Sequence, residues 1–171
     1  IGIEDLTTLK ELLAWSCGLK KLDVSKNKGL EKLDINANSL VAIDLTGLDS
    51  LTEFYTEYHG RDIELINNTF NLADLSAYGL DPGKVTLEEP CGATRDGNVL
   101  TFPENVDSIR YTYDTGKEDM VLTVTLNVVK RTESNFTVSY VENDKTVTVA
   151  ADKWEDVLKV MNNKNTDYVV Y

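Results

Sequence analysis

The chain has 171 residues, of which 42% are hydrophobic, enough to bury a substantial core in one domain or two small ones. Its formal net charge of -12 argues against a nucleic acid or an anionic membrane surface as partner, because binding phosphates requires a clustered basic face. No run of about eighteen apolar residues is present, so no membrane-spanning segment is predicted.

Residues 9–59 repeat with a period of 21, and each unit has two similar halves. Leucines mark the start of each half, and further apolar residues follow three and five positions later. Periods of about twenty to fifty residues are typical of solenoids, whose units bury apolar ridges against their neighbours. We therefore expect a stacked coil in which these side chains are almost wholly buried: Leu22, Leu33, Ile35, Ile43 and Leu45.

The segments LKKLDVSKN (19–27) and LEKLDINAN (30–38) carry the pattern L-x-x-L-x-L-x-x-N. This pattern resembles the short repeats of bacterial leucine-rich repeat surface proteins of the internalin-like type, which lead into a β-rich, immunoglobulin-like module. In that family the asparagine points inward and bonds to unpaired backbone, and cysteine sometimes replaces it. The resemblance places Cys17, Asn38 and His59 in this inward column, with Cys17 as a buried small side chain rather than a redox or metal site.

The two halves of each unit expose different side chains. Because neighbours in a short strand alternate between faces, one half exposes large and charged residues, whereas the other exposes small polar ones such as Asp23 and Asp44. The former face is the predicted binding surface, and its candidate residues are Leu13, Trp15, Asp34, Asn36, Glu53, Tyr55, Glu57 and Tyr58. The alternative is that the aromatic side chains pack against a flanking cap or the next domain.

The period is lost from Arg61, and a capping strand and short helical turn are expected to complete a first domain, residues 1–80. Residues 81–131 alternate in the manner of a small immunoglobulin-like β module, with a hairpin that turns at 114–117 (DTGK). Residues 132–171 predict a second hairpin, a helix that begins after Asp152 and a final strand, and they match no known module. The expected fold class is mainly β with minor α.

No catalytic motif, metal-ligand spacing or phosphate-binding loop is recognisable, and the sequence predicts no cofactor and no enzymatic activity. Two cysteines, Cys17 and Cys91, do not make a disulfide framework, and we expect them not to be bonded to each other. The chain begins at Ile1 without a methionine or signal peptide, so an export signal or N-terminal module is expected to have been left out or removed.

The predicted function is that of a non-enzymatic bacterial binding protein. From the family resemblance we expect it outside the cell or on its surface, where the repeat face would recognise a protein or glycan partner. The alternative is a substrate-binding or accessory domain of a secreted hydrolase. Solenoid proteins commonly bind along an extended face of this kind.

Overall fold

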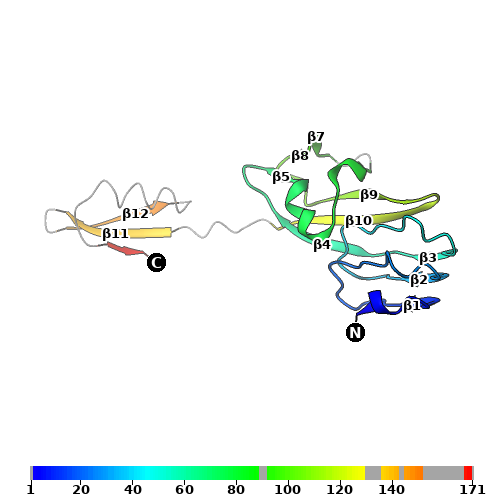
Figure 1. The fold of residues 1–171 in the computed structure, drawn as a ribbon. Helices are drawn as coiled ribbons and strands as arrows, with labels where there is room; N and C mark the ends of the chain where they lie inside the picture. The colour runs from blue at the N-terminus through cyan, green and yellow to red at the C-terminus, as the bar shows by residue number, and fades with distance from the viewer. Residues whose placement is uncertain (1, 89–91, 130–135, 143–144, 152–167, 171) are drawn as a thin grey trace. The chain divides into compact units, whose positions relative to one another are not determined.

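The computed structural model describes residues 2–88, 92–129, 136–142, 145–151 and 168–170 of the chain. The chain divides into two compact units, Ile1–Val129 and Lys130–Tyr171. The described residues of both are mainly β, as predicted (Figure 1).

The first unit begins with a short 3-10 helix, η1 (Ile3–Asp5), and three parallel strands spaced 21 residues apart. The strands pair in the order β1-β2-β3, and Leu12, Leu33 and Phe54 occupy equivalent positions. Each strand is only three residues long, and hydrogen bonds between units continue beyond it, from the Ala14 N–H to the Asp34 carbonyl and from the Ile35 N–H to the Tyr55 carbonyl. The bounds are Glu11–Leu13 for β1, Lys32–Asp34 for β2 and Glu53–Tyr55 for β3.

The repeated apolar positions form a continuous core behind this sheet. Leu33, Ile35, Ile43 and Leu45 are buried, as predicted. The prediction for Leu22 was wrong, because this side chain is only half-buried. The residue one period before Leu22 lies outside the described part of the chain, whereas Ile43 follows the described Leu22 by one period and is buried.

A four-stranded sheet with the order β4-β10-β9-β6 continues the fold. Strand β4 follows the repeats directly and runs parallel to β10, with His59 opposite Val124. The remaining neighbours in this sheet are antiparallel. The bounds are His59–Glu64 for β4, Val85–Leu87 for β6, Ser108–Lys117 for β9 and Met120–Val129 for β10.

A smaller antiparallel sheet and two 3-10 helices complete this unit. The sheet has the order β5-β8-β7, and its strands are β5 (Thr69–Asn71), β7 (Thr94–Asp96) and β8 (Val99–Thr101). The helices are η2 (Leu72–Tyr78) and η3 (Pro82–Lys84). The expected capping strand and helical turn thus correspond to β4 and η2.

The β9–β10 hairpin forms, but its predicted turn at 114–117 was wrong. Residues 114–117 lie within β9, and the turn falls on Glu118 and Asp119, where Asp119 has a φ of 59°. Gly116 has a φ of 77°, and the pairing shifts between Met120 and Val121. A left-handed glycine here makes an irregularity inside the strand rather than a turn, so the hairpin extends two residues further.

The hairpin is tied to the repeats by long-range hydrogen bonds. Tyr111 donates from its hydroxyl to the Val41 carbonyl at 2.7 Å, and the Lys117 ammonium donates to the Leu48 carbonyl at 2.9 Å. The predicted boundary at residue 80 therefore falls inside one compact unit. The division into two domains, residues 1–80 and 81–131, stays a prediction.

In the second unit, β11 (Phe136–Glu142) and β12 (Lys145–Ala151) form the predicted hairpin. The final strand β13 (Tyr168–Val170) pairs antiparallel with β11, in agreement with the predicted last strand. The helix expected after Asp152 lies outside the described residues.

Candidate binding surface

The candidate surface is the outward face of β1, β2 and β3, which we call the repeat strip. It consists of the eight predicted residues Leu13, Trp15, Asp34, Asn36, Glu53, Tyr55, Glu57 and Tyr58. Pairing aligns Leu13, Asp34 and Tyr55 in one row across the sheet. Neighbouring strands lie about 5 Å apart, so each row places three side chains within about 10 Å.

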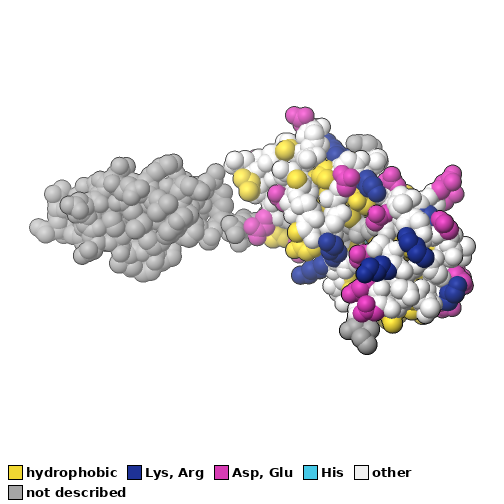
Figure 2. All heavy atoms as spheres, viewed as in Figure 1, with side chains coloured by type: hydrophobic (Ala, Val, Ile, Leu, Met, Phe, Trp, Pro, Cys, Tyr) yellow, Lys and Arg dark blue, Asp and Glu magenta, His cyan; other side chains and the backbone are white. Residues whose placement is uncertain are grey.

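Large apolar and aromatic side chains are exposed along the repeat strip. Leu13 is 58% exposed, Trp15 65%, Tyr55 44% and Tyr58 80%. These values exclude the alternative that the three aromatic rings are packed beneath the described part of the β module. Figure 2 shows, on the face in view, acidic, basic and hydrophobic side chains interspersed over this first unit.

The strip ends at a corner that recurs with the same 21-residue period. Ser16, Ala37 and Tyr58 all have positive φ, at 53°, 54° and 63°. Hydrogen bonds join these corners across the stack, from the Ser16 N–H to the Asn36 carbonyl and from the Ala37 N–H to the Glu57 carbonyl. A bulky residue is uncommon in this conformation, and Tyr58 adopts it at the position equivalent to Ser16 and Ala37.

Three side chains at the other end of the strip satisfy one another. Lys32 lies 3.1 Å from a Glu53 carboxylate oxygen and 5.5 Å from the centre of the Tyr55 ring. The Tyr55 hydroxyl donates to the same Glu53 oxygen at 3.2 Å. Hydrogen bonding with Glu53 raises the pKa of Lys32, and the same bond lowers the pKa of Glu53. The Glu53 carboxylate is therefore already bound by Lys32 and Tyr55.

The polar side chains near the corner differ in whether they have hydrogen-bond or ion-pair partners within the protein. Asn36 accepts from the Glu57 N–H through its side-chain oxygen, and it thereby holds neighbouring units in register. Asp34 accepts from the Asn36 N–H at 3.1 Å. Within the described ranges, neither Asp34 nor Glu57 has an ion-pair partner. These two carboxylates are the charges that the strip leaves available.

Behind the strip, the inward column holds the stack together through Asn38. Its side-chain oxygen accepts from the N–H groups of Cys17 and Leu19, at 3.0 and 2.9 Å. Its amide donates to the carbonyls of Ala14 and Ile35, both at 2.8 Å. One buried side chain thus satisfies backbone groups of two units, as the family resemblance implied.

The other two members of the column depart from expectation. Cys17 is a free cysteine but is exposed, so its predicted burial was wrong. No described unit lies on the far side of Cys17, whereas Asn38 is enclosed by units on both sides. Cys91 lies outside the described residues.

His59 is buried, with 2% of its surface exposed, but it does not reproduce the bonding of asparagine. Neither ring nitrogen has a hydrogen-bond partner among the described residues. Burial lowers the pKa of His59 to about 4, and the nearby Asn38 backbone opposes this shift only in part. The imidazole is therefore neutral at pH 7, and its enclosure removes it from contact with a substrate.

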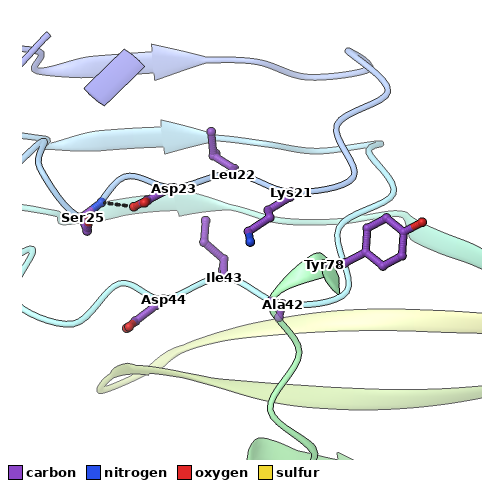
Figure 3. Close-up of a pocket in the computed structure, with 9 residues that line it drawn as sticks. Lys21, Leu22, Asp23, Ser25, Ala42, Ile43, Asp44 and Tyr78 are labelled. Carbon is purple, nitrogen blue, oxygen red and sulfur yellow. Dashed lines mark hydrogen bonds between the residues drawn. The ribbon is translucent and has the colours of Figure 1, made fainter. Parts of the chain in front are cut away.

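A pocket of about 270 Å³ is lined by residues from the second half of each repeat unit and by Tyr78 and Gly79 (Figure 3). None of its lining residues belongs to the predicted site. Asp23 and Asp44 line the pocket, and hydrogen bonds from Ser25 and Thr46 lower their pKa values. Tyr78, also in the lining, has its ring 3.6 Å from the Arg61 guanidinium. Ligand sites usually enclose about 300–1,000 Å³, so this pocket is small for one.

Other kinds of site are not found in the described part of the chain. No group of three or more His, Cys, Asp or Glu residues there is placed to hold a metal ion. The same residues contain no helix that is long and apolar enough to cross a membrane.

A scan of protein-family models and a search of curated proteins both found no match. Among solved structures, the chain is similar to the functional domain of InlJ from Listeria monocytogenes, which is described as including a cysteine ladder. The identity is 16% and the TM-score 0.36, with 75% of this chain and 36% of the InlJ chain covered. A similarity this low assigns no function to this chain.

Proposed function

We propose that this protein is a non-enzymatic binding protein that recognises a protein or glycan partner through the repeat strip. In this proposal residues 1–80 are a short leucine-rich repeat solenoid with a C-terminal cap, and residues 81–131 are a small immunoglobulin-like β module. The protein acts outside the cell or on its surface. The repeat pattern and the bonding of Asn38 to two units support the solenoid assignment.

The exposure of large side chains on one face carries the functional proposal. Trp15 and Tyr58 leave more than half of their surface in water, and Leu13 does the same. Binding energy at protein interfaces is concentrated in a few aromatic and arginine side chains that become buried. A face that presents such side chains beside unpaired carboxylates offers both contact area and charge.

The test is a screen of glycan arrays and displayed peptides with wild type and the Trp15→Ala, Tyr55→Ala double variant. We expect the variant to lose more than about 2 kcal/mol of binding free energy, about thirtyfold in affinity, while its circular dichroism is unchanged. The control is Asp23→Asn with Asp44→Asn, which alters the pocket side and leaves the strip intact. Equal binding by the double variant and wild type would remove the strip as the site.

A further inference from the structure

The repeat strip already holds one cation of its own. The Lys32 ammonium sits against the Tyr55 ring and the Glu53 carboxylate, which are themselves hydrogen-bonded. An aromatic face combined with a carboxylate attracts a cation through the ring quadrupole and through direct charge. Lys32 thus shows, within the protein, that an aromatic ring and a carboxylate on this face together hold a cation.

The same face repeats these ingredients without a cation. Asp34 stands in register between Leu13 and Tyr55, and Glu57 follows Tyr55 by two positions along the coil. Trp15 holds the position equivalent to Glu57 in the 21-residue repeat, Tyr58 follows Glu57 directly, and both rings are exposed. The described residues place no Lys or Arg within ion-pair distance of either carboxylate.

A neutral partner would compensate these charges less fully than a cationic one. Covering Asp34 and Glu57 removes water from two negative charges, and a neutral sugar returns hydroxyl donors but no charge. The guanidinium of an arginine or the ammonium of a lysine supplies a positive charge to both carboxylates. The apolar stem of either side chain can lie along the indole of Trp15. The net charge of -12 further favours approach by a cationic partner.

We propose that the partner is a protein segment that presents an Arg or Lys side chain to Asp34 and Glu57, with Trp15 and Tyr58 flanking it. This inference rests on the proposed function, because it assigns the class of partner to the same strip. Arginine fits best, since its planar guanidinium both stacks on aromatic rings and pairs with carboxylates in a bidentate manner.

The experiment uses the full chain labelled with ¹⁵N and two synthetic Gly-Ser peptides of identical sequence, one with interspersed arginines and one with citrulline in their place. Citrulline keeps the shape of the side chain but carries no charge. The Trp15 indole N–H and the backbone amides of Asp34 and Glu57 report binding. We expect these signals to shift with the arginine peptide and to need at least about tenfold more of the citrulline peptide.

Two matched variants separate the site from general charge attraction. Asp34→Asn with Glu57→Gln removes two negative charges from the strip, and Asn retains the oxygen that accepts from the Asn36 N–H. Asp23→Asn with Asp44→Asn removes the same charge from the pocket side. We expect the first pair to weaken the arginine peptide at least about tenfold and the second to change it less than about twofold.

Several outcomes would overturn the inference. These are equal binding of the citrulline peptide, equal losses in the two variant pairs, or no shift at the strip with either peptide. A partner from the array screen that needs Trp15 and Tyr55 but tolerates Asp34→Asn with Glu57→Gln would leave the proposed function standing and refute the cationic partner. Binding that ignores Trp15→Ala with Tyr55→Ala would refute the proposed function itself.

Discussion

Replacing His59 with asparagine tests whether one buried imidazole sets the acid sensitivity of the first unit. His59 is the only histidine of the chain, is 2% exposed and has no hydrogen-bond partner among the described residues. Asn38 holds the equivalent position 21 residues earlier, so asparagine is compatible with the backbone at this column. The substitution therefore removes the titrating group, and the effect of the smaller side chain on stability does not depend on pH.

The expected magnitude follows from the pKa of His59, which is 6.5 in the unfolded chain and about 4 in the folded one. Between these values the unfolded chain binds the proton and the folded chain does not, so acidification favours unfolding. Stability is fully present above pH 6.5 and is lost as the pH falls towards 4. A difference of about 2.5 in pKa corresponds to roughly 3 kcal/mol of unfolding free energy.

The assay is urea unfolding from pH 7 to pH 4, followed by methyl NMR signals of Leu33 and Leu122, which report the first unit. Wild type should lose about 3 kcal/mol more than His59→Asn over this range. Asp23 and Asp44 have lowered pKa values, so their losses fall below about pH 3.8 and are common to both proteins. Parallel stability curves for the two proteins would refute the assignment of acid sensitivity to His59.

Leu33→Ala should cost about 2–5 kcal/mol through the cavity left between two units, measured by urea unfolding, and a cost below about 1 kcal/mol would contradict the stacked core. Tyr111→Phe should cost about 1–3 kcal/mol, because it leaves the buried Val41 carbonyl without its donor, and an unchanged unfolding midpoint would show that the bond is dispensable. Thiol titration of denatured, unreduced protein should count two free thiols, Cys17 and Cys91, whereas a single bridge found by mass spectrometry would overturn this expectation.

Features that depend on one unit and its neighbour were predictable from the sequence. The spacing of Leu33, Ile35, Ile43 and Leu45 identified the core because each coil repeats the same environment. The position of Asn38 identified the residue that satisfies backbone groups of two units. The outward face was predictable for the same reason, since alternation along a short strand fixes which side chains point to solvent.

Features that depend on the ends of the stack were not predictable. Cys17 and Leu22 follow the pattern, yet they lie in the first unit and are covered less completely than the residues one period later. The pattern specifies which way a side chain points, but burial also requires a neighbour on each side. His59 similarly lies in the inward column but lacks the side-chain hydrogen bonds to backbone groups that Asn38 makes there.

Long-range contacts left no local signal. The bond from Tyr111 to Val41 joins residues 70 positions apart, and the alternation within residues 81–131 indicated only a small β module. In the site, the grouping of Lys32, Glu53 and Tyr55 depends on side-chain conformations across two strands, which spacing alone does not determine. The sequence thus predicted the strip but not which of its charges remain unpaired.

The parallel pairing of β4 with β10 has a mechanical consequence. Tension between Tyr58 and Val129 would pull β4 from its start and β10 from its end, so the two strands would be drawn in opposite directions along their length. Six residue pairs, from His59–Val124 to Glu64–Val129, would then share the load instead of separating one at a time. Optical-trap extension between these points would show a force peak, and gradual peeling would exclude it. The strand that closes the repeats is also the strand through which a pull on a bound partner would enter the β sheet.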